Sequence, residues 1–263
     1  MSDNKKEVLI KADGVCQSFG QGDEVVNVIK NVNFEIRNNT FNVIYGASGS
    51  GKSTMLNILT GLQRPSKGII TFKGEDVYSF TPDELARFRA SRIGIVYQSN
   101  YWVQSLNVME NVAMPLYFLG YNRSLAADMA MIALERIDMQ SYAKKYPSVL
   151  SGGEQQRVAM ARAIVNDPMF IIADEPTGSL DSKNGDKIMD LLRRAYSDSL
   201  RTIILVTHNM EYLPLADNLL HIQDGEVQNP DSSSIKATTD EMINSMKERL
   251  DQFANAKQKK VEL

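Results

Sequence analysis

Residues 46–53 are the segment whose residue types and spacing point most directly to chemistry. They read Gly-Ala-Ser-Gly-Ser-Gly-Lys-Ser and match the pattern G-x-x-x-x-G-K-[ST] at every fixed position. Small residues let the backbone curl so that successive N–H groups point at a phosphate, and a helix that begins there adds the positive end of its dipole. Lys52 would then bridge the β- and γ-phosphates, and the Ser53 hydroxyl would bind Mg²⁺.

The context of this motif favours phosphate binding. A strand-like run at residues 41–45 precedes it, and a helix-like run at residues 53–60 follows it. The alternative, a flexible glycine–serine loop that binds nothing, does not require either element. The residues expected to hold the phosphates are Gly46, Ser48, Gly49, Ser50, Gly51, Lys52, Ser53 and Thr54.

Two adjacent carboxylates, Asp174 and Glu175, end an apolar run at residues 169–173. Ligands of open α/β sheets bind at the C-terminal edge of the strands, where Asp174 is expected to lie. There it would hold Mg²⁺ through water, and Glu175 would act as the general base toward the attacking water. On its own, such a pair is usually a solvated acidic turn after a buried strand, but the phosphate-binding motif upstream weighs against that interpretation.

Alternating strands and helices must position these groups. Apolar runs at residues 169–173 and 202–206 are typical of strands buried on both faces of a parallel sheet, whereas alternation at residues 32–36 predicts a half-buried antiparallel strand. We therefore expect an α/β fold of the P-loop type with a mostly parallel sheet, an N-terminal antiparallel β part and an inserted helical subdomain at about residues 99–166. Further strands are expected at residues 8–10, 41–45, 68–72 and 93–97, helices within 53–60, 107–138 and 153–165, and a hairpin with a primed turn at residues 219–227.

Composition excludes several classes of protein. The chain has 263 residues, of which 43% are apolar and 23% charged, so a disordered or fibrous chain is excluded. A net charge of −3 disfavours a general nucleic-acid-binding role. The single cysteine, Cys16, fits a reducing compartment and lies too far along the chain from the two histidines to suggest a zinc site. The sequence has no run of about 18 apolar residues and no secretory pattern, so we expect a cytosolic protein without a membrane span.

A third motif, Leu-Ser-Gly-Gly-Glu-Gln-Gln-Arg, lies at residues 150–157. Ser151 and the two glycines after it would form a second anion site at a helix N-terminus, able to reach a γ-phosphate only when brought to it from another chain. In isolation, Ser-Gly-Gly before a helix is more often a plain N-cap. Here the motif resembles the LSGGQ signature of ATP-binding-cassette (ABC) ATPases, with Glu154 at the position that usually holds Gln.

Other residues follow in the order that this resemblance implies. Gln98 matches the glutamine that senses Mg²⁺ and water, His208 the switch histidine that contacts the γ-phosphate, and Asp181 the loop that crosses a dimer interface. Phe19 lies where the family places an aromatic ring, usually Tyr, that stacks on adenine, although it could also belong to the core. His221 has no such match and is expected to be a packing or surface residue. The resemblance implies Glu175, His208, Gln98 and Lys52 as catalytic residues, Ser53, Gln98 and Asp174 as Mg²⁺ ligands, and Phe19, Ser151, Gly152, Gly153, Glu154 and Asp181 as further ATP contacts.

The resemblance covers about residues 7–228 and implies partners as well as the cofactors ATP and Mg²⁺. It implies an ATP-dependent, head-to-tail homodimer in which ATP lies between the Lys52 side of one subunit and the Ser151 side of the other. It also implies that a groove near Gln98 docks a cytoplasmic helix of a separately encoded transmembrane permease. The chain would then lie peripherally on the cytoplasmic face of the membrane.

Residues 173–181 and 111–116 are similar to the ABC subgroup that serves lipoprotein release, macrolide-type efflux, peptide-antibiotic resistance and FtsE-type cell division. The function implied is ATP hydrolysis that powers export or extraction of a lipophilic or peptide substrate. The alternative is an FtsE-like module that regulates an extracytoplasmic enzyme through a membrane partner and moves no cargo. A DNA-acting ABC ATPase is disfavoured because heptad repeats and a basic excess are both absent from the sequence.

Two features lie outside these motifs. Trp102 is expected either to pack against a partner helix or to belong to the core. We expect an ABC ATPase domain at residues 1–228, followed by a linker and an amphipathic C-terminal helix within residues 229–263. Packing on its own domain is the main expectation for that helix, with binding to a partner or to a membrane surface as alternatives.

Overall fold

The computed structural model describes residues 6–20 and 24–228, which form two sheets and the helices that pack on them. The strands are β1 (Val8–Phe19), β2 (Val26–Arg37), β3 (Phe41–Tyr45), β4 (Lys67–Phe72), β5 (Glu75–Asp76), β6 (Ile93–Val96), β7 (Phe170–Asp174), β8 (Thr202–Thr207), β9 (Asn218–Gln223) and β10 (Glu226–Gln228). The α-helices are α1 (Lys52–Leu59), α2 (Pro82–Arg92), α3 (Val108–Phe118), α4 (Arg123–Glu135), α5 (Gly152–Ile164) and α6 (Ser182–Ser197). Short 3₁₀ helices lie at Val77–Ser79, Gln140–Tyr142, Pro147–Val149 and Met210–Leu215.

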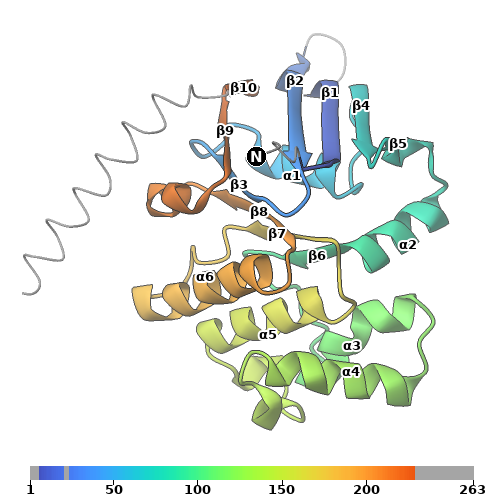
Figure 1. The fold of residues 1–263 in the computed structure, drawn as a ribbon, viewed down its shortest axis with the longest axis vertical. Helices are drawn as coiled ribbons and strands as arrows, with labels where there is room; N and C mark the ends of the chain where they lie inside the picture. The colour runs from blue at the N-terminus through green and yellow to red at the C-terminus, as the bar shows by residue number, and fades with distance from the viewer. Residues whose placement is uncertain (1–5, 21–23, 229–263) are drawn as a thin grey trace, which may run out of the picture.

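The two sheets differ in the direction of their strands. The smaller one has the order β2-β1-β4-β5 and is antiparallel throughout. The larger one has the order β10-β9-β3-β8-β7-β6, and all of its strands run parallel except β10. Figure 1 shows the antiparallel sheet at the top, the helices α3, α4 and α5 at the bottom, and the larger sheet between them. This arrangement confirms the predicted α/β fold with a mostly parallel sheet and an N-terminal antiparallel part.

The central strands of the larger sheet are covered on both faces. Every residue of β8 is buried, as are the first four residues of β3 and of β7. Side chains alternate along each strand, so Ile171 and Leu205 join a core with α3 to α6, whereas Ile172 and Ile204 join a core with α1 and the antiparallel sheet. Coverage of both faces explains why these strands appear in the sequence as unbroken apolar runs.

The stretch predicted as helical at residues 107–138 contains two helices. α3 begins with a capping box made by Asn107 and Glu110, and a turn at Gly120, with φ of 84°, separates it from α4. Both helices pack with α5 around buried aliphatic side chains, among them Val112 and Ala130. These helices carry α5, and with it the Ser-Gly-Gly motif, on the side of the sheet opposite to the antiparallel strands (Figure 1).

Two helices were not predicted from the sequence. α2 has no fully buried residue, and only Leu85 and Phe88 pack against the core, so its apolar face is too short to identify an amphipathic helix from the sequence. It begins instead with a capping box of Thr81 and Glu84 and with Pro82 in its first turn. α6 does bury a face that includes Ile188 and Leu192, so the spacing of its apolar residues could have revealed it.

The C-terminal part of the described chain forms the predicted hairpin. β9 and β10 pair antiparallel, and Asp224 and Gly225 have φ values of 50° and 82°, as a type I′ turn requires. The linker and amphipathic helix expected at residues 229–263 lie outside the described residues, so that expectation stays a prediction. Within residues 6–20 and 24–228, no helix is long and apolar enough to cross a membrane.

Candidate active site

β3 leads directly into the glycine-rich loop, which curls around the amine of Lys52. Lys52 is only 8% exposed, and its Nζ donates hydrogen bonds to the carbonyl oxygens of Gly46 (2.9 Å) and Ala47 (2.8 Å). Gly51 precedes α1 with φ of 106°, and a Cβ at this position would lie 2.8 Å from Cδ1 of Ile29. Glycine is therefore required there by both the backbone conformation and the available space.

A cavity of about 490 Å³ lies against this loop and gathers residues from distant parts of the chain. In the loop itself, the hydroxyl of Ser50 is buried and has no hydrogen-bond partner in the described structure. The lining of the cavity itself offers the Lys52 amine and the hydroxyls of Ser48, Ser53 and Thr54, which can donate to phosphate oxygens, so the loop fits the anion that its sequence predicts. The residues that line the cavity are Val28, Ser48, Gly49, Gly51, Lys52, Ser53, Thr54, Gln98, Asp174, Glu175 and His208.

Asp174 and Glu175 stand at the end of β7, at the edge of this cavity. Burial, and secondarily the neighbouring Glu175 carboxylate, raise the pKa of Asp174, while Lys52 opposes this shift. Glu175 has φ of 45°, a conformation that strains a residue other than glycine and is found preferentially at functional sites. Its carboxylate accepts hydrogen bonds from the backbone N–H of His208 (2.8 Å) and the hydroxyl of Thr207 (3.2 Å), and it lies 2.7 Å from His208 Nδ1. These contacts fix the direction of the Glu175 side chain.

Gln98 follows β6 by two residues and reaches the same cavity. A Cβ built on Gly178 would lie 3.2 Å from the side-chain nitrogen of Gln98, so this side chain lies against the loop that follows Glu175. Ser53 and Asp174 add a hydroxyl and a carboxylate, the hard oxygen ligands that Mg²⁺ prefers. The cavity therefore combines the glycine-rich loop and its lysine amine with oxygen atoms of the kind that a divalent cation prefers and with an oriented carboxylate.

Residues 151–154 and Asp181 do not line this cavity, but they lie next to each other. Ser151 is the N-cap of α5 and Asp181 the N-cap of α6, where its carboxylate accepts a hydrogen bond from the backbone N–H of Asn184 (2.9 Å). Hydrogen bonds from Asn184 lower the pKa of Asp181. A Cβ on Gly153 would come within 2.7 Å of Asn184 Cγ, so the two helix ends approach this closely because position 153 is glycine. The predicted site residues thus fall into two groups, one that lines the cavity and one that does not.

The two aromatic residues considered in the sequence analysis differ in environment. Phe19 ends β1 opposite Val26 and is 45% exposed, so it does not belong to the core. It does not line the cavity of the phosphate loop, and its stacking on adenine stays a prediction. His221 lies on β9 and stacks on Tyr45 with ring centroids 4.6 Å apart, which is the packing role expected for it.

Trp102 links the segment after Gln98 to helix α5. Its indole N–H donates a hydrogen bond to Oε1 of Gln155 (2.9 Å), and the guanidinium of Arg162 lies 4.4 Å from the ring centroid. Arg162 also donates to the carbonyl oxygen of Asn100 (2.6 Å). The ring is half-buried, so Trp102 is neither a fully buried core residue nor a free surface anchor. Neither the sequence motif nor the resemblance signalled Gln155 or Arg162 as its partners.

Replacement of Trp102 by Phe is expected to destabilise the chain by at least about 1 kcal/mol, because the donor to Gln155 is lost and the phenyl ring fills less space than the indole. For a chain of this size the melting temperature should fall by roughly 2–4 °C. Thermal unfolding of W102F beside Y101F tests this, because Tyr101 is 73% exposed and keeps its ring contact with Tyr97 as Phe. Equal melting temperatures for W102F and the unmodified chain would show that the indole hydrogen bond contributes nothing.

Comparison with known proteins identifies the family. Residues 29–178 match the family described as ABC transporter. The chain is 39% identical over 224 residues to the ABC transporter ATP-binding protein MJ0796 of Methanocaldococcus jannaschii, covering 84% of this chain and 95% of that one. It is 36% identical over 228 residues to the lipoprotein-releasing system ATP-binding protein LolD of Shewanella oneidensis, covering 87% and 99%. It is also 41% identical over 217 residues to the macrolide export ATP-binding/permease protein MacB of a Shewanella species, covering 82% of this chain but only 33% of MacB.

Solved structures agree with these relationships. A dimeric, post-hydrolysis structure of the ATP-binding cassette MJ0796 bound to ADP and Pi superposes with a TM-score of 0.78 at 37% identity, covering 84% of this chain and 97% of that one. A second dimeric MJ0796 structure gives the same TM-score at 38% identity. The phosphate loop, the carboxylate pair and the Ser-Gly-Gly helix end described above occur in a fold shared with these cassettes. The chain therefore belongs to the ABC transporter family and is one of its ATP-hydrolysing cassettes.

Proposed function

We propose that this chain is the ATPase subunit of a transporter of the lipoprotein-release or macrolide-export type, and that it works as an ATP-dependent, head-to-tail homodimer on the cytoplasmic face of a membrane. A separate transmembrane permease would convert dimer closing and opening into export or extraction of a lipophilic or peptide substrate. Similarity to LolD and to the ATP-binding third of MacB supports this subgroup.

One observation carries the dimer proposal. Lys52, Glu175 and His208 line one cavity, while Ser151, the predicted γ-phosphate donor, lies on a different surface of the same chain. A single subunit therefore presents half of a complete site. In a head-to-tail pair, Ser151 of one chain would face the Lys52 loop of the other, and both sites would be completed at once by the same two-fold contact.

The geometry suggests how ATP would be hydrolysed. The backbone of the glycine-rich loop and Lys52 would hold the β- and γ-phosphates, and Glu175 would accept a proton from water as the water oxygen bonds to the γ-phosphorus. The bond from the γ-phosphorus to the bridging oxygen breaks, and ADP leaves with that electron pair. His208 and Thr207 hold the carboxylate of Glu175 in place during this step. Ser53, Asp174 and Gln98 would hold Mg²⁺, which would neutralise charge on the phosphates when bound.

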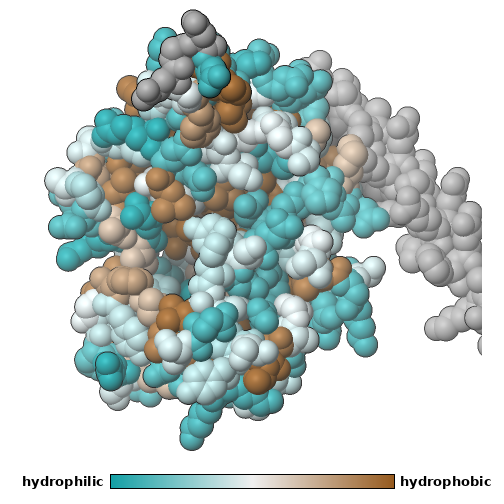
Figure 2. Space-filling model, turned by 180° about the vertical axis from the view of Figure 1, so that it is seen from behind, coloured by the Kyte–Doolittle hydropathy of each residue, from teal (hydrophilic) through white to brown (hydrophobic). Residues whose placement is uncertain are grey.

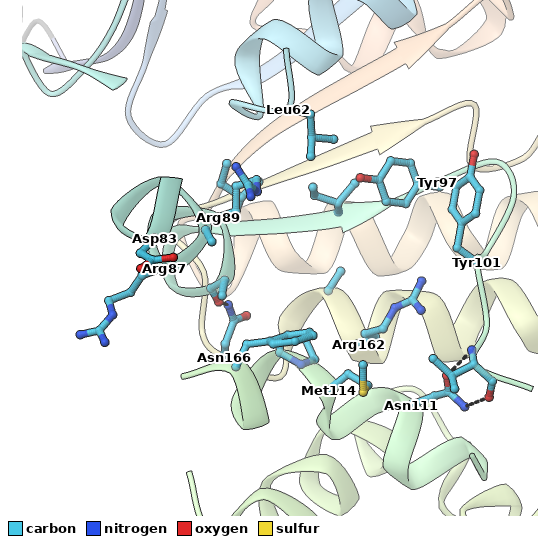
Figure 3. A pocket seen from close by; sticks show the side chains of 18 residues that line it. Leu62, Asp83, Arg87, Arg89, Tyr97, Tyr101, Asn111, Met114, Arg162 and Asn166 are labelled. Atoms are coloured by element: carbon cyan, nitrogen blue, oxygen red, sulfur yellow. Dashed lines mark hydrogen bonds between the residues drawn. The ribbon is translucent and has the colours of Figure 1, made fainter. Parts of the chain in front are cut away.

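A groove between α2, α3 and α5 is the proposed contact with the permease. It has a volume of about 760 Å³, and its lining includes the apolar side chains of Met114 and Phe118. Arg87, Arg89 and Arg162 also line it, as Figure 3 shows. Figure 2 shows hydrophobic residues gathered along a hollow on the face of the molecule opposite to that of Figure 1. An amphipathic cytoplasmic helix of the permease, with apolar residues on one face and a carboxylate that meets the arginines, fits this lining.

Shared active sites predict how turnover depends on protein concentration. If each site requires residues of two chains, the rate of ATP hydrolysis should rise with about the square of protein concentration while most of the chain is monomeric. The rate of phosphate release, measured over a hundredfold dilution series at saturating ATP and Mg²⁺, tests this expectation. A rate strictly proportional to protein concentration over the whole series would argue against a transient dimer as the active species.

The identity of the membrane partner distinguishes the transport function from the alternative, regulation of an extracytoplasmic enzyme. The chain with Glu175→Gln, purified with ATP from detergent-solubilised membranes, should retain its permease, which mass spectrometry would identify. A polytopic protein with a substrate-handling extracytoplasmic domain supports the transport role. A partner with an extracytoplasmic enzyme-binding domain supports the FtsE-like alternative. Recovery of the ATPase alone, under conditions where its dimer is closed, would contradict both.

A further inference from the structure

Ser151, the serine of the signature motif, already makes hydrogen bonds to a side chain of its own helix, Glu154. The carboxylate of Glu154 accepts a hydrogen bond from the backbone N–H of Ser151 (2.8 Å) and a second one from the Ser151 hydroxyl (2.8 Å). In return, the Ser151 oxygen accepts the backbone N–H of Glu154 at 3.4 Å. Ser151 has a single hydroxyl hydrogen, so it cannot donate to Glu154 and to a phosphate oxygen at the same time.

The Glu154 carboxylate is held firmly in its ionised form. Hydrogen bonds from the Tyr142 hydroxyl and from Ser151 lower the pKa of Glu154 to about 2, and the nearby Arg157 adds a smaller effect in the same direction. The group is therefore fully charged at any pH at which the protein would work. A permanent anion thus lies at the start of α5, where the helix dipole and the first N–H groups favour negative charge.

We propose that Glu154 competes with ATP for the Ser151 hydroxyl. In the separated subunit its carboxylate accepts the hydrogen bond of that hydroxyl, and this raises the ATP concentration needed to close the dimer. This inference rests on the head-to-tail dimer proposed above, in which Ser151 meets the γ-phosphate of the ATP bound to the partner. Closure would require the hydroxyl to turn from Glu154 to the phosphate. It would also bring two anions together in an interface from which water is excluded, where like charges repel more strongly.

The negative charge of Glu154, and not its role in capping α5, is what would oppose ATP. Glutamine at position 154 retains the capping box, because its side-chain oxygen can still accept the N–H of Ser151. It is uncharged, and it is a weaker acceptor for the Ser151 hydroxyl. The family signature that this motif resembles has glutamine here, so the chain with Glu154→Gln restores the usual residue of the family.

The chain contains a matched control for this substitution. At the start of α2, Glu84 accepts the backbone N–H of Thr81 (2.8 Å) and the Thr81 hydroxyl (2.8 Å), and Thr81 accepts the N–H of Glu84 at 3.3 Å. The geometry is the same as at Ser151, and hydrogen bonds from Thr81 likewise lower the pKa of Glu84. Neither residue lines the phosphate-loop cavity or belongs to the signature motif. The substitution Glu84→Gln therefore measures what the loss of a capping charge does by itself.

The experiment compares Glu154→Gln and Glu84→Gln in the chain that also carries Glu175→Gln, so that bound ATP is not consumed. The fraction of dimer is followed against ATP concentration by size-exclusion chromatography with light scattering. We expect E154Q to lower the ATP concentration for half-maximal dimer by about five- to tenfold, since each dimer contains two such sites, and E84Q to leave it unchanged. The difference should largely persist as salt is raised from 50 to 500 mM, because charges in an interface from which water is excluded are screened much less than exposed ones.

Steady-state kinetics add an independent measurement. With Glu175 intact, E154Q should lower KM for ATP by a similar factor while kcat changes less than about twofold, since the substitution alters closure and leaves the base in place. An unchanged or higher half-maximal ATP concentration in E154Q, or an equal shift in E84Q, would overturn the inference. Failure of the parent chain to dimerise at any ATP concentration would instead overturn the proposed dimer, and the two failures are therefore distinguishable.

Discussion

The chain with Glu175→Gln is expected to hydrolyse ATP at least about 100-fold more slowly than the unmodified chain, the lower end of what a general base contributes. Glutamine has the same shape, and its oxygen can still accept the backbone N–H of His208 that Glu175 accepts now. The geometry of the site should therefore persist, while the acceptor for the proton of the attacking water is lost. ATP binding should be retained, so that the closed dimer accumulates.

Two measurements test this expectation together. The rate of phosphate release measures how far ATP hydrolysis is slowed. Size-exclusion chromatography with light scattering measures the fraction of chain that is dimeric with ATP. Glu226→Gln is the matched control, because Glu226 lies exposed on β10 and outside the cavity, so its substitution should change neither quantity. Normal turnover in E175Q would show that another group accepts the proton.

Lys52→Ala is expected to weaken ATP binding by about 10- to 100-fold, the range that corresponds to hydrogen bonds from a charged donor. The amine is buried between the carbonyl oxygens of Gly46 and Ala47 and lies in the wall of the cavity. Lys52 is the only lysine or arginine that lines this cavity, so the substitution removes the main positive charge available to the phosphates. It also leaves two carbonyl groups without their donor.

Binding and stability must be separated for this variant. Calorimetric titration with ATP measures affinity, and thermal unfolding without nucleotide measures the effect of the two freed carbonyl groups. Lys144→Ala serves as the control, because Lys144 is exposed between the short helix Gln140–Tyr142 and α5, far along the chain from the loop. An affinity of K52A within twofold of the K144A value would contradict the assigned role of Lys52 in phosphate binding.

Short-range patterns explain what could be predicted from the sequence. The glycine-rich loop was identified because glycine and lysine at that spacing are required by the local backbone path, as the φ of 106° at Gly51 illustrates. The buried strands were identified because both faces of a parallel sheet are covered, which leaves unbroken apolar runs such as β8. α2 was not predicted because only two partly buried residues, Leu85 and Phe88, contact the core, which is too short an apolar pattern to show a helical period.

The sequence by itself determined the family and the groups proposed to do the chemistry, namely the glycine-rich loop, the carboxylate pair and the Ser-Gly-Gly helix start, together with the sheet that carries them. Only the tertiary structure decided which of these groups meet. Glu175 contacts His208, 33 residues away, because β7 and β8 pair in parallel with Asp174 opposite Val206. Ser151 does not line the cavity of Lys52, because α5 packs with α3 and α4 on one face of the sheet. Contacts of this kind depend on strand register and helix packing, which the spacing of residues along a chain does not encode locally.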